Sequence, residues 1–163
     1  EVRAAALAGL GCVGLNGLLI TPEYGSWVFL GEIVTSLDLP VSGDGIKPCI
    51  RCGKCRESCP GGAIGTDGVE TDRCLSHISQ KKRDLSPWEY DLIRKGGSAW
   101  GCDICQEVCP MNRAAAETYL PEFRTGLFPV IRPGQSESLE NRAFHWRGPK
   151  VIERNLHLLN NDL

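Results

Sequence analysis

The pattern of apolar and polar residues along the first part of the chain predicts short elements with glycine-rich breaks. Glu1–Leu10 is rich in alanine and is followed by glycines, which predicts a helix. Leu18–Thr21 and Trp27–Thr35 are apolar runs on either side of the turn Thr21–Gly25, which predicts strands. Val41–Pro48 combines glycines with flanking prolines and is expected to be a connector.

Helix signals are clearer in the second half of the chain. Thr71 or Asp72 is expected to cap a short helix that carries Cys74. Ser86-Pro87-Trp88-Glu89 has the capping-box pattern with Pro at the first helical position, and this helix should stop at Gly96-Gly97.

The C-terminal region combines an irregular segment with one more helix. Pro121–Gly134 has no regular apolar pattern. Gly148-Pro149 should open a final helix, in which Ile152, Leu156 and Leu159 share one face that needs a packing partner.

Composition excludes several classes of protein. The net charge of −2 over 163 residues gives no overall signal for nucleic acid or membrane binding. No apolar run approaches the ~18 residues needed to cross a bilayer, and the glycine-broken stretch Ala4–Ile20 lacks the basic leader of a signal peptide. The chain begins at Glu1, in what reads as the middle of a helix, so we expect it to be part of a longer protein.

Nine cysteines are the strongest chemical signal in the sequence. Disulfides fit poorly, because the count is odd and four thiols fall within eleven residues. Zinc would favour separated C-x2-C pairs, often with histidine, and His77, His145 and His157 show no such pairing. An iron–sulfur protein is the third and preferred interpretation.

Cysteine spacing predicts two 4Fe–4S clusters. Cys49, Cys52, Cys55 and Cys59-Pro60 form the full bacterial ferredoxin run, in which three cysteines bind one cluster and the fourth reaches the other. The second run, Cys102, Cys105 and Cys109-Pro110, has Ala99 where a symmetric ferredoxin has cysteine, and Cys74 is the obvious replacement. The expected ligands are Cys49, Cys52, Cys55 and Cys109 for cluster I, and Cys59, Cys74, Cys102 and Cys105 for cluster II.

Residue chemistry alone leads to electron transfer. Two clusters without an open iron position pass single electrons, and no phosphate loop or supported nucleophile–base pair accompanies them. Cys12 is left over, and its apolar surroundings predict a small buried side chain rather than a ligand.

Several segments resemble the epoxyqueuosine reductase family, which shares a superfamily with reductive dehalogenases. The likeness runs from about Glu1 to Asn160 and includes the displaced Cys74. Its clearest stretches are residues 5–11, 20–27, 30–32, 101–110 and 146–150.

The resemblance implies an α+β fold: a bacterial di-cluster ferredoxin-like module preceded by the end of a nitroreductase-like α/β cobalamin domain. The implied boundaries are 1–40 for the cobalamin domain, 41–120 for the cluster module and 121–163 for a C-terminal extension. Leu19, Thr21, Leu30 and Ser76 would contact cobalamin. The family's proton-donating aspartate would lie upstream of Glu1, so no catalytic residue is assigned and this chain alone should be inactive.

Family membership further implies reduction of epoxyqueuosine in tRNA, the last step of queuosine formation, by a cytoplasmic and monomeric oxidoreductase. A low-potential donor such as a flavodoxin or ferredoxin would supply the electrons. Basic residues that could contact tRNA phosphates are Lys81, Lys82, Arg83, Arg147 and Lys150, whereas a solvated helix face is the alternative for the region of Arg132 to Arg154.

Two other functions stay open on these grounds. The chain could belong to a plain di-cluster electron carrier, although Cys74 and the residues before Cys49 are not needed there. A reductive-dehalogenase-like enzyme with another substrate would share the clusters. Departures from the family in residues 11–16 and at His77 concern the substrate more than the redox centres.

Overall fold

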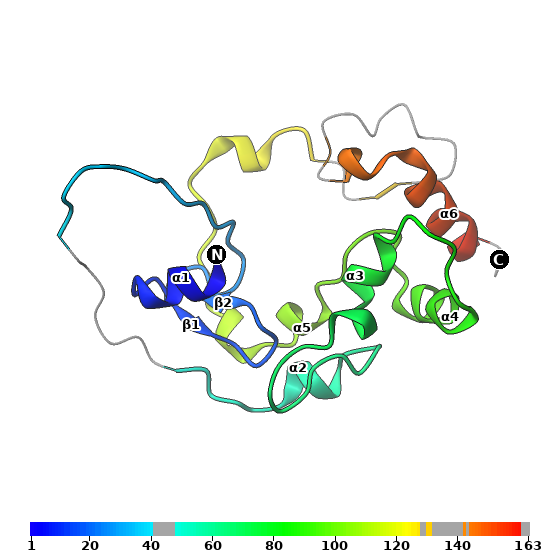
Figure 1. Cartoon of the computed structure of the whole chain (residues 1–163), viewed down its shortest axis with the longest axis horizontal. Helices are drawn as coiled ribbons and strands as arrows, with labels where there is room; N and C mark the ends of the chain where they lie inside the picture. Colours follow the sequence, from blue (N-terminus) through cyan, green and yellow to red (C-terminus); the bar gives the residue numbers. More distant parts are fainter. Residues whose placement is uncertain (41–47, 128–129, 132–141, 143, 161–163) are drawn as a thin grey trace. The chain divides into compact units, whose positions relative to one another are not determined.

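A computed structural model describes residues 1–40, 48–127, 130–131, 142 and 144–160 (Figure 1). Most of the predicted connector Val41–Pro48 and much of Pro121–Gly134 lie outside the described residues. The chain forms two compact units, each assembled from separate stretches of sequence. Unit 1 contains residues 1–59, 64–69 and 104–121, and unit 2 contains residues 60–63, 70–103 and 122–163.

Unit 1 begins with a small helix packed on a two-stranded sheet. Helix α1 (Val2–Leu7) is shorter than the predicted Glu1–Leu10 and packs on β1 (Cys12–Val13) and β2 (Leu19–Ile20). The strands are antiparallel, with Cys12 opposite Ile20. Glycine is required at position 11, because a Cβ there would lie 2.5 Å from the Ile20 carbonyl oxygen.

The predicted turn after β2 is confirmed and is fixed by its own side chains. Thr21 and Gly25 form a bridge, and the Thr21 hydroxyl donates to the Gly25 carbonyl at 3.0 Å. The buried Ser26 then donates its N–H to Asn112 Oδ1 at 2.9 Å. Asn112 Nδ2 in turn donates to Ser26 Oγ and to the Gln106 carbonyl, both at 2.8 Å. These bonds tie the turn to the second cysteine run.

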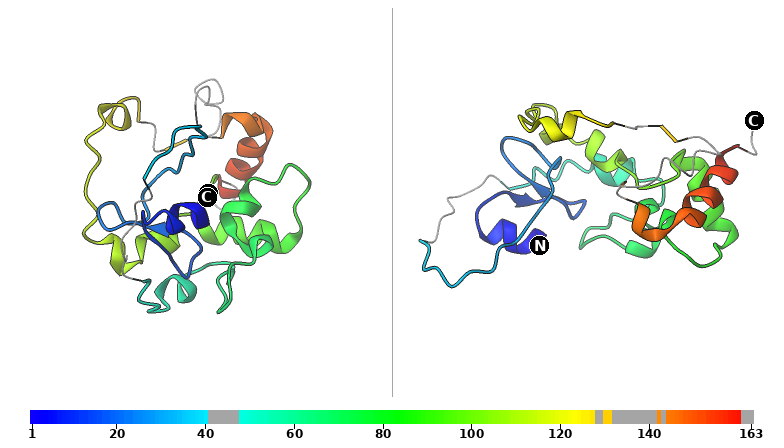
Figure 2. Two further views of the ribbon diagram at one scale, coloured as in Figure 1. Left: turned by 60° about the vertical axis from the view of Figure 1, so that its left-hand side comes forward. Right: turned by 90° about the horizontal axis from the view of Figure 1, so that it is seen from above.

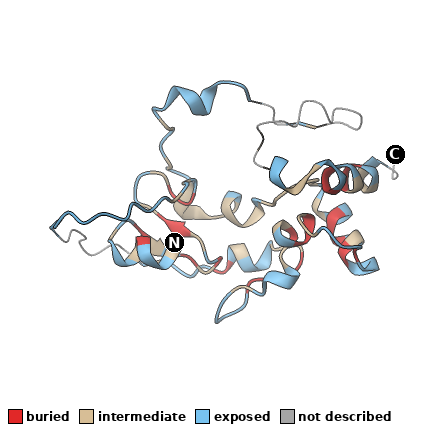
Figure 3. Ribbon diagram, turned by 45° about the horizontal axis from the view of Figure 1, so that its top comes forward, coloured by how far each residue is buried: buried red, intermediate tan, exposed pale blue. Residues whose placement is uncertain are grey.

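The predicted strand Trp27–Thr35 is wrong: this segment has no regular secondary structure and no ladder partner among the described residues. Phe29, Ile33 and Val34 are 88%, 92% and 100% exposed. Most of the segment has the exposed colour of Figure 3, and Val28 and Leu30 are half-buried. Apolar β-branched residues favour a strand only when a neighbouring strand completes the hydrogen bonds.

The cysteine runs of unit 1 lie in short helical turns. Helix α2 (Lys54–Glu57) follows the first two cysteines and contains the third, Cys55, and α5 (Ile104–Glu107) packs against it. The 3-10 helix η2 (Pro110–Asn112) follows Cys109. Ile64 and Val69 form an isolated antiparallel β-bridge that closes the turn between them.

Unit 2 has a helical core. It contains η1 (Thr71–Arg73), α3 (Leu75–Ser79), α4 (Pro87–Gly96), all but the first residue of η3 (Pro121–Arg124), η5 (His145–Arg147) and α6 (Pro149–Asn160). Helix α4 packs against both α3 and α6, as Figures 1 and 2 show. Leu75, Ile78 and Ile93 are 0–1% exposed and form the centre of the core.

The predicted limits of α4 are confirmed. Ser86 Oγ accepts from the Glu89 N–H, and Glu89 Oε2 accepts from the Ser86 N–H at 2.8 Å, which completes the capping box. Gly97 ends the helix with φ of 64°, a left-handed conformation that glycine adopts without strain. The predicted caps of the Cys74 helix are wrong, because Cys74 itself is the N-cap of α3 and no side chain caps it.

The predicted final helix is also confirmed, and its packing partner is the rest of unit 2. Ile152 and Leu156 are buried against Ala99, Trp100 and Phe144. The fully buried Asn155 donates to the carbonyls of Ser79 and Ala99, both at 2.8 Å. No helix in the described ranges is both long and apolar enough to cross a membrane.

Candidate iron–sulfur centre

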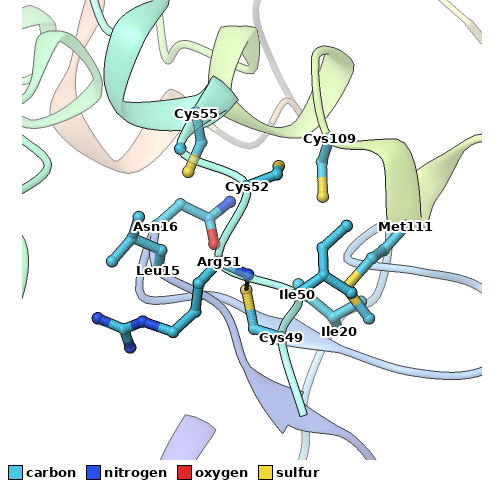
Figure 4. Close-up of a pocket in the computed structure, with 11 residues that line it drawn as sticks. Leu15, Asn16, Ile20, Cys49, Ile50, Arg51, Cys52, Cys55, Cys109 and Met111 are labelled. Carbon is cyan, nitrogen blue, oxygen red and sulfur yellow. Dashed lines mark hydrogen bonds between the residues drawn. The ribbon is translucent and has the colours of Figure 1, made fainter. Parts of the chain in front are cut away.

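The first cysteine loop is shaped by residues with left-handed backbone conformations. Gly53 has φ of 82° and is the N-cap of α2. Arg51 has φ of 50°, the single positive value among the described residues other than glycine. The Arg51 N–H donates to Cys49 Sγ at 3.5 Å, drawn as a dashed line in Figure 4. A backbone N–H aimed at sulfur stabilises a thiolate, as expected beside an iron–sulfur cluster.

The structure brings the cluster I cysteines together. Cys49, Cys52, Cys55 and Cys109 line one pocket, with Cys109 supplied by the segment between α5 and η2 (Figure 4). Leu15, Ile20 and Met111 form apolar walls of the same pocket. This environment fits a cluster with thiolate ligands and apolar surroundings.

The four thiols surround a space and do not converge on one atom. Within the described ranges, no group of three or more potential ligands is arranged to hold a single metal ion. In a cubane each thiolate binds a different iron, so its ligands surround the cluster. The geometry of the four cysteines is therefore compatible with the cluster that their spacing predicts.

Burial and mutual repulsion raise the pKa of the Cys55 thiol. Burial is the larger cause, and the neighbouring thiols of Cys109, Cys49 and Cys52 add to it, against a backbone hydrogen bond from Arg56. The positive charge of bound iron is what would keep such a thiol deprotonated.

The ninth cysteine lies closer to cluster I than its sequence suggests. Cys12 is half-buried in β1, and burial followed by the charge of Cys49 raises the pKa of its thiol. The backbone N–H of Cys49 acts in the opposite direction. Cys12 thus lies near Cys49, a predicted ligand. No sequence signal indicated this, because the ferredoxin run that Cys49 begins starts 37 residues after Cys12.

The cluster II cysteines are divided between the units: Cys59 and Cys105 lie in unit 1, and Cys74 and Cys102 lie in unit 2. Within unit 2, Cys74 begins α3, and Ser79 at the end of α3 accepts a hydrogen bond from the Gly101 N–H at 3.1 Å. Cys102 also packs against the core cluster that contains Leu75. The displaced Cys74 and the first cysteine of the second run, Cys102, are therefore held in the same packed unit.

The position of the absent cysteine has a structural use of its own. Ala99 contacts the buried face of α6, and its carbonyl accepts a hydrogen bond from Asn155. The backbone here is thus anchored to α6. Where a symmetric ferredoxin has a cysteine ligand, this chain has an alanine that packs against α6.

The residues expected near cobalamin differ in accessibility. Leu30 is half-buried beside an open hollow that Ala4, Ala8 and Phe29 line together with Glu1 and Glu32. Leu19 is only 2% exposed. The Thr21 hydroxyl is used within its own turn, and Ser76, half-buried in α3, accepts hydrogen bonds through its carbonyl from Ser79 and Gln80.

The basic run Lys81-Lys82-Arg83 is largely engaged inside unit 2. Glu89 is 4% exposed and binds Lys81 Nζ at 2.9 Å and Arg83 Nη2 at 2.8 Å. Burial would raise the pKa of Glu89, but hydrogen bonds from Arg83, the Ser86 N–H and Lys81 outweigh it and lower the pKa to about 2. Sequence reasoning recognised Glu89 only as part of a capping box and missed this ion-pair network.

The other basic candidates lie near the start of α6. The Arg147 guanidinium lies 4.0 Å from the centre of the Trp146 ring, a cation–π contact on a side chain that is 63% exposed. Lys150 is exposed in the first turn of α6. Arg132 lies outside the described residues.

The cysteine arrangement defines an iron–sulfur protein with two clusters. Residues 48–112 match the family model described as a 4Fe-4S double cluster binding domain. This range includes the eight predicted ligands and excludes Cys12.

Nearly the whole chain matches the C-terminal part of epoxyqueuosine reductases. It is 40% identical to the Lactococcus garvieae enzyme over 167 residues, covering 96% of this chain and 47% of that protein. Identity to the Listeria monocytogenes enzyme is 35%, covering 95% of this chain and 43% of the relative. The chain thus spans less than half the length of these curated relatives.

Solved structures give the same result. The Bacillus subtilis epoxyqueuosine reductase matches 98% of this chain with a TM-score of 0.82 and 31% identity, over 45% of its own chain. The Streptococcus thermophilus enzyme matches 98% of this chain and 44% of its own, with a TM-score of 0.77 and 30% identity. A third structure, an epoxyqueuosine reductase with a tRNA-Tyr epoxyqueuosine-modified stem loop, has a TM-score of 0.80.

Proposed function

We propose that this chain is the electron-delivery part of a cobalamin-dependent epoxyqueuosine reductase that acts on tRNA. The observation that carries the proposal is the extent of the structural match, which covers 98% of the chain rather than the cluster module alone. The match therefore takes in α1, both strands and α6, which a free di-cluster ferredoxin does not need.

In this proposal the two clusters form a short electron relay. Cluster I is bound by Cys49, Cys52, Cys55 and Cys109, and cluster II by Cys59, Cys74, Cys102 and Cys105. The shared pocket of the first set supports cluster I. The anchoring of Gly101 to α3 supports the pairing of Cys74 with Cys102 in cluster II.

Residues 1–40 would complete a nitroreductase-like cobalamin domain, with residues 41–120 as the cluster module and 121–163 as an extension. The residues fit cobalamin in part: Leu30 offers an apolar surface beside an open hollow, whereas the buried Leu19 could contribute only limited contact. Thr21 and Ser76 are the remaining proposed contacts. When bound, cobalamin would supply the centre at which the delivered electrons reduce the epoxide.

Phosphate contacts with tRNA are proposed at Lys82, Arg147 and Lys150, with smaller roles for Lys81 and Arg83. Lys82 is exposed and takes part in none of the ion pairs among the described residues. Lys81 and Arg83 would first have to give up part of their bonding to Glu89. An exposed aromatic ring stacked with Arg147 is the kind of surface that RNA bases contact.

Anaerobic turnover by the full-length protein tests this function. Reconstituted enzyme with cobalamin and a chemical reductant should convert an epoxyqueuosine-containing tRNA stem loop to its queuosine form. Cluster content should be about eight irons and eight sulfides per chain, as expected for two cubanes. Cluster reduction without any turnover, with cobalamin bound, would instead favour an electron carrier or a reductase with another substrate.

Cys74→Ala tests the asymmetric wiring. It should remove about half of the iron, because only cluster II loses a ligand, and should abolish turnover. Cys12→Ala is the matched control and should keep the full iron content, since Cys12 lies outside the 48–112 domain. Full iron content in the Cys74 variant would contradict the proposed ligand set.

A further inference from the structure

The first cysteine loop carries a basic surface on a chain that is acidic overall. Arg51, Lys54 and Arg56 are all exposed and lie within six residues of sequence, whereas the chain has a net charge of −2. We call these three side chains, together with Cys52, the cluster loop face. Glu57 and Asp67 are the exposed acidic residues nearest to it in the loop and in the 64–69 turn.

The cluster loop face coincides with the most accessible ligand of cluster I. Cys52 is exposed, whereas Cys49, Cys55 and Cys109 are only partly accessible. In Figure 4, Cys52 lies on the pocket beside Arg51. Electron tunnelling slows steeply with distance, so a protein donor must approach the edge of a cluster that is nearest to solvent.

The basic side chains are positioned by the loop and are not consumed by internal pairing. Arg51 Nη2 donates to the Thr66 carbonyl at 3.3 Å, which holds its guanidinium over the 64–69 turn. Lys54 and Arg56 occupy α2 directly after the left-handed Gly53. Neither takes part in any ion pair recorded among the described residues.

We propose that the cluster loop face is the docking surface for an acidic one-electron carrier protein, so that electrons reach this protein first at cluster I. Opposite charge increases the rate of encounter between such proteins and aligns their redox centres. The inference rests on the proposed function in one respect, the assignment of Cys49, Cys52, Cys55 and Cys109 to a cluster. It adds the place and the chemistry of the donor contact.

RNA is the competing occupant of a basic surface. The cluster loop face favours a protein donor because its charges lie within four residues of the exposed ligand Cys52 in sequence and because no aromatic side chain belongs to the loop, residues 49–59. Nucleic-acid surfaces commonly interleave basic and aromatic residues for stacking. The aromatic and basic pair at Trp146 and Arg147 is the better RNA candidate on this chain.

Charge reversal on full-length, cluster-loaded protein tests the proposal. The double variant Lys54→Glu/Arg56→Glu is compared with Arg94→Glu/Lys95→Glu, which makes the same charge change at exposed positions of α4. Stopped-flow absorbance follows cluster reduction by a reduced acidic flavodoxin at low salt. Binding of the oxidised flavodoxin is measured separately by calorimetry, and iron content confirms that both clusters are present.

The Lys54/Arg56 variant should be reduced about tenfold more slowly at low salt and should bind flavodoxin about tenfold more weakly. Both differences should disappear at about 0.5 M salt because the charges are screened. Reduction by the methyl viologen radical, a small molecule that needs no docking surface, should be at least as fast as in the wild type. The α4 variant should behave like the wild type in each measurement.

Equal reduction and binding by the two double variants would overturn the docking proposal while leaving the clusters intact. Weaker binding of a tRNA stem loop with unchanged flavodoxin kinetics would also overturn it and assign the surface to RNA. Wild-type protein that cannot be loaded with eight irons would instead contradict the proposed function itself. The three failures are therefore distinguishable.

Discussion

Each of the two compact units of this chain is stabilised by a different kind of interaction. Unit 2 has a hydrophobic core in which Ile78, Ile93 and Ile152 are fully buried between helices. In unit 1 the described helices are no longer than six residues, and the buried apolar residues include Leu19 and Ile20 of its two-stranded sheet. Its loops surround cysteine thiols instead.

This difference shows where each unit obtains its stability. Burial of apolar side chains stabilises unit 2 independently of any cofactor. In unit 1 the loop at Cys49–Cys55 includes Arg51, whose backbone is in the left-handed region. This conformation costs free energy and persists only where the surroundings of the residue stabilise it. Metal ligation can supply that free energy, because a cluster binds the folded loop and not the unfolded one.

Cluster removal should produce the largest difference in amide exchange between the two units. Anaerobic chelation should increase amide exchange in residues 49–59 by orders of magnitude, because the loop loses its cross-links. Amides of α4 and α6 should keep most of their protection. Exchange detected by mass spectrometry checks both regions in one sample, and equal loss of protection in α4 would show that unit 2 also depends on the clusters.

Ile152→Ala should cause a large loss of stability in unit 2. The side chain is 0% exposed, and its truncation should cost about 2–5 kcal/mol through lost burial and a residual cavity. Denaturant unfolding followed by circular dichroism measures the change. The exposed neighbour Glu153→Ala should cost less than about 0.5 kcal/mol.

Glu89→Gln should weaken unit 2 by about 2 kcal/mol at neutral pH, because Lys81 loses a partly buried ionic partner. The pKa of Glu89 is lowered from 4.5 to about 2 on folding, so its contribution is complete above about pH 4.5 and is lost as the pH falls toward 2.

The pH dependence of α4 amide exchange tests this sign. The measurement is made after chelation, so that acid loss of the clusters does not contribute. The wild type should lose its advantage over Glu89→Gln between pH 4.5 and 2. Asp91→Asn, at a side chain that is 74% exposed, is the control and should show little difference from the wild type.

Asn112→Ala should have the smallest of these effects and should be confined to unit 1. It removes the side-chain bonds to Ser26 and to the Gln106 carbonyl, which should cost about 1 kcal/mol because these groups are only partly buried. Faster amide exchange at Ser26 is the expected readout. Arg113→Ala, an exposed neighbour, should leave that amide unchanged.

Local signals made parts of this structure predictable. The ends of α4 follow from Ser86 to Glu89 at one end and Gly97 at the other, because caps depend on neighbouring residues. Cys49, Cys52 and Cys55 are also close to one another in sequence, so their spacing alone predicts that they share a site. Cys109 joins this site only through tertiary structure, and a known pattern of ligand crossing was needed to predict it.

Features that depend on distant partners were not predictable. Trp27–Thr35 has a strand-like composition, but a strand needs a neighbour, and composition does not say whether one is present. Glu89 serves both the helix start and two basic side chains, and only its local function left a sequence pattern. The contact of Ala99 with α6 likewise joins residues more than 50 positions apart.

The extended segment Trp27–Thr35 has a practical consequence for handling this chain. Its backbone N–H and C=O groups take part in no ladder within the described residues, and Phe29, Ile33 and Val34 expose large apolar side chains. Such a segment is a template for pairing between chains. We expect the isolated chain to self-associate with rising concentration, and Ile33→Lys to improve its solubility.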